Sequence, residues 1–87
     1  NQMYKIFKYT NSLDEYKKFQ DKGFSVYTCL NFSGLYLIQF DESYDREEAE
    51  YVCRFETDLY NCRCYVSKNG QKIFLTEPRK PLTEEGS

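Results

Sequence analysis

The pair Asn69-Gly70 constrains the fold of this chain more than any other feature of its sequence. It lies between segments 62–68 and 71–76, which are rich in the β-branched and aromatic residues typical of strands. Two-residue hairpins of type I′ need positive φ at both central positions, and Asn-Gly meets that need with little strain. The two segments are therefore predicted to pair as a tight antiparallel hairpin.

A strand and a helix are predicted at the start of the chain. Residues 4–9 have the aromatic and β-branched content of a strand. Ser12-Leu13-Asp14-Glu15 matches a capping box, in which the Ser hydroxyl accepts a backbone N–H and the Glu carboxylate reaches back. Gly23 would end the resulting helix of about three turns, since glycine readily takes the left-handed conformation that follows many helices.

A strand pair and a second helix are predicted in the middle of the chain. Residues 24–30 and 35–40 read as strands around the turn-forming segment 31–34. Asp45 is a good N-cap for a helix that continues to about Thr57. The buried stripe of this helix is predicted to consist of Ala49, Val52, Cys53, Phe55 and Leu59.

The predicted order of elements, β-α-β-β-α-β-β, is typical of an α+β fold. The first six match the ferredoxin-like βαββαβ antiparallel sheet with both helices on one face, and the C-terminal hairpin adds a fifth strand. Residues 1–76 are predicted to form this single domain, and residues 77–87, with two prolines, a flexible tail. Such a sheet has one packed face and one open face.

Composition excludes several classes of protein. Charged residues make up 30% of the chain, but the net charge is only −2, which is not the strongly basic balance of many nucleic-acid-binding domains. No apolar run reaches the roughly 18 residues of a membrane span, and the start does not resemble a signal peptide. A cytoplasmic protein without a membrane partner is therefore expected. The abundance of Phe, Tyr and Lys, with a single Ala, indicates an AT-rich coding genome, as in many phages and low-GC bacteria.

Alternation along the strands divides their side chains between the two faces of the sheet. For the first strand, Tyr4 with Ile6 and Phe7 with Tyr9 are nearly equal candidates for burial. The inner set of the other strands is predicted to comprise Val26, Leu30, Tyr36, Ile38, Phe40, Cys62, Cys64 and Val66. If Ile6 is buried, the outer set contains Phe7, Tyr9, Tyr27, Leu35, Leu37 and Tyr65, with Phe74 as a further member.

An outer set this apolar predicts an interaction surface. Contiguous apolar patches of more than a few hundred Å² usually mark binding sites on proteins, and tyrosine is favoured at interfaces. The alternative is that the 16 aromatic residues are simply spread over both faces, because a domain this small cannot bury them all.

The four cysteines, Cys29, Cys53, Cys62 and Cys64, are predicted to be free thiols, with no metal bound. Zinc sites typically use C-x₂₋₄-C pairs, and Cys62-Arg63-Cys64 is one residue tighter, in a chain without histidine. If the protein is exported, a disulfide from Cys53 to Cys62 or Cys64 is the alternative.

Catalysis is not expected. No cysteine has a histidine partner, no serine lies in a G-x-S-x-G elbow, and no glycine-rich loop is present to bind phosphates. The sequence therefore predicts a protein that is not an enzyme and has no catalytic residues and no cofactor.

Residues 3–67 resemble the SPOR domain, a bacterial module with the same order of strands and helices. The resemblance rests on Lys22-Gly23-Phe24, on Gly34-Leu35-Tyr36-Leu37-Ile38 and on Arg46-Glu47-Glu48-Ala49-Glu50. It implies binding of peptidoglycan glycan strands on the sheet, near Tyr9, Tyr27 and Leu37.

The same region is also similar to an RNA-recognition motif. The segment 34–40 lies where that family has its third-strand signature, with Leu35 and Leu37 in place of the base-stacking aromatics. This similarity implies RNA binding on the sheet face, where Tyr9, Tyr27 and Tyr65 would form the stacking platform.

Taken together, these features predict a small, non-enzymatic interaction protein. We expect a phage-type inhibitor or regulator that docks a bacterial protein through the open aromatic face, or a second copy of itself in a two-fold homodimer. Glycan-strand binding and RNA binding are the alternatives.

Overall fold

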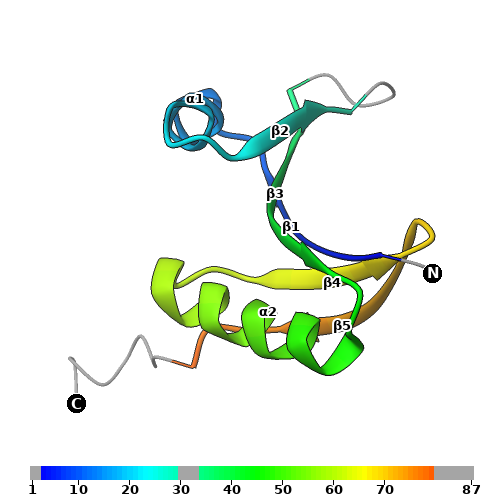
Figure 1. Cartoon of the computed structure of the whole chain (residues 1–87). Coiled ribbons are helices and arrows are strands. Elements are labelled where there is room, and N and C mark those ends of the chain that lie inside the picture. Colours follow the sequence, from blue (N-terminus) through cyan, green and yellow to red (C-terminus); the bar gives the residue numbers. More distant parts are fainter. Residues whose placement is uncertain (1–2, 30–33, 80–87) are drawn as a thin grey trace, which may run out of the picture.

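In the computed structural model, two helices pack against a five-stranded antiparallel sheet (Figure 1). The structure describes residues 3–29 and 34–79. In chain order the elements are β1 (Tyr4–Thr10), α1 (Leu13–Asp21), β2 (Ser25–Thr28), β3 (Tyr36–Ser43), α2 (Arg46–Tyr60), β4 (Cys64–Lys68) and β5 (Gln71–Thr76). The strand order is β2-β3-β1-β4-β5, which confirms the predicted α+β class and the fifth strand.

Some sequence predictions fall wholly or partly outside the described residues. These are the inward position of Leu30, the turn 31–34 apart from Gly34, and most of the proposed tail 77–87. Among the described strands, β2 is shorter than predicted, and β3 extends three residues further, to Ser43.

In the central strand β1, the side chains of Tyr4 and Ile6 face the helices. Ile6 has no exposed surface and belongs to the core, and Tyr4 packs against the same core. Phe7 and Tyr9 therefore point to the other face, as predicted for the case of a buried Ile6. The register between β1 and β3 shifts at this point, so that Phe40 is the extra residue of a β-bulge.

Four aromatic rings hold both helices to the same face of the sheet. Phe19 of α1 lies 5.4 Å from Phe40 of β3 and 5.1 Å from Tyr60 of α2, measured between ring centroids. Phe40 and Tyr60 stack at 5.1 Å, and Phe24 meets Phe40 edge-on at 5.6 Å. Aromatic pairs in such geometries contribute about 0.5–1.5 kcal/mol beyond their buried area. We call these four residues the ring cluster.

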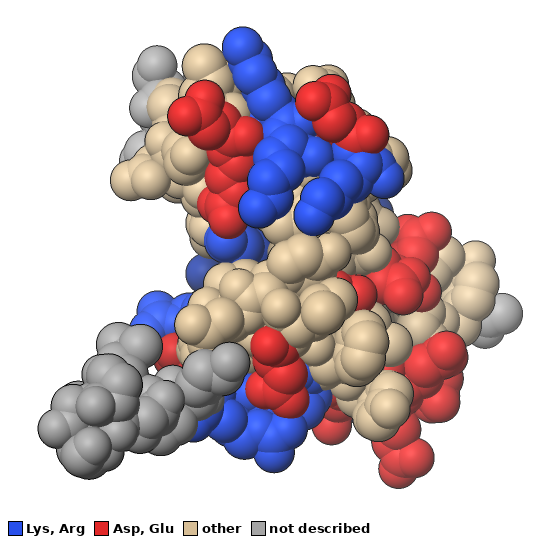
Figure 2. Space-filling view, turned by 90° about the vertical axis from the view of Figure 1, so that its left-hand side faces the viewer, with Lys and Arg blue, Asp and Glu red and all other residues tan. Residues whose placement is uncertain are grey.

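Two lysines, one in the last turn of α1 and one at its C-cap, lie over the solvent side of the ring cluster. The Lys22 ammonium is 5.5 Å from the ring centroid of Phe19 and 5.6 Å from that of Tyr60, and Lys18 is 5.6 Å from Phe19. Figure 2 shows lysine and arginine side chains gathered over the upper part of the molecule, above a band of uncharged atoms. The lysines thus cover the rings while their charges stay in water.

The ends of α1 follow the predicted chemistry, with one change. The Ser12 hydroxyl accepts a hydrogen bond from the backbone N–H of Glu15 at 3.1 Å, and Gly23 adopts a φ of 96°. The Glu15 carboxylate does not complete the capping box. It forms an ion pair with Lys8 of β1 instead, which ties the helix to the central strand.

The predicted buried stripe of α2 is wrong at two of its five positions. Ala49 and Cys53 are fully buried, but Phe55 is 53% exposed and Leu59 is 58% exposed. The helix instead turns Thr57 and Tyr60 inward, because these residues continue the line of Ala49 and Cys53 at spacings of three and four. Phe55 and Leu59 lie two positions after Cys53 and Thr57, roughly 200° around the helix.

This placement predicts opposite outcomes for the same substitution at two phenylalanines. Phe19→Ala empties the centre of the ring cluster and is expected to lower the free energy of unfolding by about 3–5 kcal/mol. Phe55→Ala removes a solvent-facing ring and is expected to change it by less than about 0.5 kcal/mol. Urea unfolding followed by far-UV circular dichroism measures both. Equal losses at the two sites would contradict the inward face assigned to α2.

Candidate functional site

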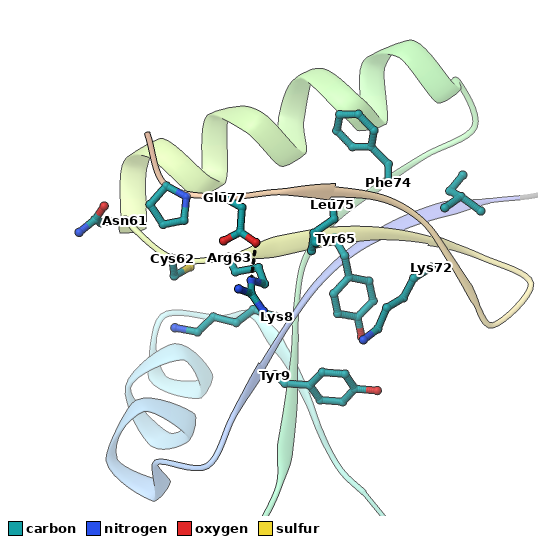
Figure 3. Close-up of a pocket in the computed structure, with 12 residues that line it drawn as sticks. Lys8, Tyr9, Asn61, Cys62, Arg63, Tyr65, Lys72, Phe74, Leu75 and Glu77 are labelled. Atoms are coloured by element: carbon teal, nitrogen blue, oxygen red, sulfur yellow. Dashed lines mark ion pairs between the residues drawn. The ribbon is translucent and has the colours of Figure 1, made fainter. Parts of the chain in front are cut away.

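A hollow of about 870 Å³ opens on the side of the β4–β5 hairpin that faces away from α2 (Figure 3). It exists because β1 and β4 part. Their pairing ends at Phe7 opposite Tyr65, and beyond that point Tyr9 pairs only with β3 and Cys64 only with β5. Residues of β1, of the segment 61–63 and of β5 line the space between them. We call it the β1–β4 hollow.

Of the six predicted surface residues, Tyr9 and Tyr65 line this hollow, and Phe7 and Leu37 lie beside them. The rings of Phe7 and Tyr9 each lie 5.7 Å from the ring of Tyr65. Leu37 joins the three rings in a smaller adjoining hollow of about 290 Å³. Phe7 and Tyr65 are only 8% and 6% exposed, so they form the floor of the site, whereas Tyr9 is 44% exposed.

Tyr27 and Leu35 do not line either hollow. Tyr27 pairs with Leu37 across the β2–β3 ladder, and its hydroxyl donates to Oε1 of Gln39 at 3.2 Å. Leu35 precedes β3, and its carbonyl accepts a hydrogen bond from the backbone N–H of Cys29 at 3.2 Å.

The outward position predicted for Phe74 is wrong, and the reason is a second β-bulge. Counting back from the turn would place Phe74 opposite Tyr65, but the register shifts between Val66 and Ser67. Phe74 therefore pairs with Val66 and packs against the core, and Figure 3 shows its ring directed towards α2. Leu75 takes the place opposite Tyr65 and is 52% exposed.

Lys72 is a residue of the site that sequence reasoning missed. Its ammonium lies 4.9 Å from the ring centroid of Tyr9 and 4.7 Å from that of Tyr65, within cation–π range. The Asn-Gly turn places Lys72 opposite Ser67, and Ser67 lies two residues after Tyr65 on the same strand. Because Tyr65 is predicted to point outward, this register could have placed Lys72 on the open face.

The charges around the hollow leave one cation without a carboxylate. Lys8 is paired with Glu15, and Arg63 with Glu77 at 2.9 Å. Lys72 makes no ion pair within residues 3–29 and 34–79. Burial raises the pKa of the Tyr65 hydroxyl further above its usual range, so this phenol supplies no negative charge to Lys72. Among the described residues, Lys72 is thus the cation of the hollow that no carboxylate compensates, and it lies over two tyrosine rings.

Cys62 lines the other end of the hollow, and the buried Cys64 lies behind it. The sulfur atoms of Cys62 and Cys64 are 3.7 Å apart. The hydrogen bond from the Cys64 thiol, aided by the charge of Lys8, lowers the pKa of Cys62 to about 7. The same contact, together with complete burial, raises the pKa of Cys64. Cys62 is therefore the partner that carries the thiolate.

The remaining cysteines are separate from this pair. All four cysteines are free thiols, and Cys53 shares a hydrogen bond with Oγ1 of Thr76 at 3.2 Å rather than contacting another cysteine. Across the described residues, no three histidine, cysteine or carboxylate side chains gather as a metal site would need.

Comparison with protein-family models, curated proteins and solved structures found no match to this chain. Of the two described helices, neither combines the length and the hydrophobicity that crossing a membrane requires. The likenesses to the SPOR domain and the RNA-recognition motif thus stay predictions.

The thiol geometry predicts a graded reactivity of the cysteines. Cys62 is expected to react fastest with iodoacetamide in the folded protein, with a half-maximal rate near pH 7, because only its thiolate attacks. Pulse alkylation across a pH series, read by peptide mass spectrometry, measures this. In Cys64→Ala the midpoint is expected to move upward, since the donated hydrogen bond is lost. A midpoint for Cys62 in the ordinary thiol range in the unmutated protein would contradict the contact.

Proposed function

We propose that this domain binds a segment of another protein in the β1–β4 hollow and has no catalytic role. The observation that carries the proposal is Lys72, which has no ion pair among the described residues and lies over two tyrosine rings at the β1–β4 hollow. The exposed side chains of Tyr9 and Leu75 extend the apolar area beside it. Such a site suits a segment in which a carboxylate adjoins an apolar side chain.

The arrangement favours a protein ligand over a single-stranded nucleic acid. Base stacking requires open aromatic faces. Here the Lys72 ammonium lies over the rings of Tyr9 and Tyr65, and Tyr65 and Phe7 are almost fully buried. A base would have to displace the lysine before it could stack on Tyr9.

Glycan-strand binding is the second candidate, and a different part of the open face supports it. Tyr27 donates to the side-chain carbonyl of Gln39, whose amide donates to Oε1 of Glu42 at 3.0 Å. This exposed chain of polar groups beside aromatic rings offers the donors and acceptors that sugar hydroxyls use.

The ferredoxin-like fold, the inhibitory role, the cytoplasmic location and the homodimer are further proposals. The ferredoxin-like arrangement is supported by the position of β1 between β3 and β4, with both helices packed on the ring-cluster face. The phage-type inhibitory role and the cytoplasmic location are supported by composition alone. A homodimer through the open face is supported by its exposed apolar residues.

Charge reversal at Lys72 tests the docking site. An array of short synthetic peptides with an acidic residue beside apolar ones is compared with the same array carrying lysine in place of the acid. The unmutated protein is expected to bind the acidic series, and Lys72→Glu to weaken that binding at least tenfold, about 1.4 kcal/mol. The loss reflects repulsion where an ion pair formed before.

Lys17→Glu is the matched control, because it makes the same charge change on an exposed position of α1 away from the hollow. It is expected to bind like the unmutated protein. Equal binding of both arrays, or no effect of Lys72→Glu, would overturn the proposal. Cosedimentation with amidase-treated sacculi would favour the glycan candidate instead, and a salt-sensitive gel shift would favour RNA.

A further inference from the structure

The sulfur atoms of Cys62 and Cys64 lie closer together than two side chains on one face of a regular strand would. Residues two apart on one face of a strand are separated by roughly 6.6 Å, twice the rise per residue. Cys62 lies before β4, in the bend that follows Asn61 in its left-handed conformation, with φ 53°. This bend reduces the distance between the sulfurs to 3.7 Å.

The two thiols differ in access. Cys62 lines the β1–β4 hollow and is half-buried, so a small molecule in the hollow can reach it. Cys64 has no exposed surface and lies behind it, with its thiol directed at the sulfur and the carbonyl of Cys62. Lys8, on the neighbouring strand, lies close enough to stabilise a thiolate at Cys62. This is the arrangement of an attacking and a resolving thiol.

We propose that Cys62 and Cys64 form a thiol modification site, at which reaction with a low-molecular-weight disulfide joins them in an intrachain disulfide. The proposal goes beyond the docking function and does not depend on it, because it uses the thiol end of the hollow and not Lys72.

The reaction is a pair of thiol–disulfide exchanges. The Cys62 thiolate attacks one sulfur of the disulfide RSSR, which forms a mixed disulfide and releases RS⁻. Cys64 then transfers its proton to the released thiolate, and its sulfur attacks the sulfur of Cys62 and expels the second RS⁻, which takes a proton from water. The two protein thiols lose two electrons in total, and one RSSR becomes two RSH.

The other cysteines are poorly placed to compete. Cys53 is fully buried and hydrogen-bonded to Thr76 on the packed side of the sheet. Cys29 follows β2, which lies at the opposite edge of the sheet, beyond β3 and β1. Cys64 is therefore the nearest thiol that can resolve a mixed disulfide at Cys62.

The full chain offers a direct readout, because trypsin cleaves after Arg63. Cys62 falls in peptide 55–63, Cys64 in peptide 64–68 and Cys53 in peptide 47–54. The protein is incubated with excess oxidised glutathione, the remaining thiols are alkylated, and the tryptic peptides are mapped without reduction. We expect the alkylatable thiols to fall from four to two, and peptides 55–63 and 64–68 to be linked.

Two variants separate the roles of the thiols. Cys64→Ser is expected to accumulate the glutathione adduct on Cys62, since nothing resolves it, whereas Cys29→Ser should behave like the unmutated protein. Three results in the unmutated protein would overturn the proposal: a lasting adduct with Cys64 still alkylatable, a link to peptide 47–54, or four unchanged thiols. These readings come from the unmutated chain, so they hold even if Cys64→Ser folds poorly.

Discussion

The packing of Phe19, Phe24, Phe40 and Tyr60 determines the architecture on which the site depends. Phe19 belongs to α1, Phe24 to the segment between α1 and β2, Phe40 to β3 and Tyr60 to α2. Each ring touches at least two others. Because they meet on one face, both helices must lie on that face. Within residues 3–29 and 34–79, no helix or strand covers the opposite face of the sheet, so the apolar residues there are buried only against one another.

The sheet is bent near two irregularities in its strand pairing. One register shift lies between Ile6 and Phe7 and the other between Val66 and Ser67, and β-bulges of this kind increase local twist. Figure 1 shows the resulting curve, with β1 and β3 swinging from the level of β2 to that of β4. Tyr65 pairs with Phe7 across β4 and β1, and the two buried rings lie against each other. Just beyond this pair β1 and β4 part, and the hollow opens between them.

The sequence was a good guide wherever a feature is decided by a few neighbouring residues. Asn69 and Gly70 both take the positive φ that their hairpin needs, and Ser12 caps its helix as its position indicates. Features decided by distant partners were predicted less well. In α2, apolar residues occupy two faces of the helix. The helical spacing of apolar residues alone does not show which face meets the sheet, and for this reason the inward prediction for Phe55 and Leu59 is wrong. Around β5 a single bulged residue reverses the facing of everything beyond it, and no local pattern announces a bulge.

The proposed docking site is the hollow rather than the exposed stripe of α2, because contacts within the protein already hold the side chains of the hollow in place. Tyr51, Phe55 and Leu59 follow one another at spacings of four on one face of α2, and all three are exposed. Within residues 3–29 and 34–79 no ring contact holds Tyr51 or Phe55 in place, and exposed apolar residues are ordinary on protein surfaces. In the hollow, by contrast, Tyr9 and Lys72 are held by ring contacts to Tyr65, which is itself buried against Phe7. Groups that are already ordered lose little side-chain entropy when a ligand arrives, so more of the contact energy remains as affinity.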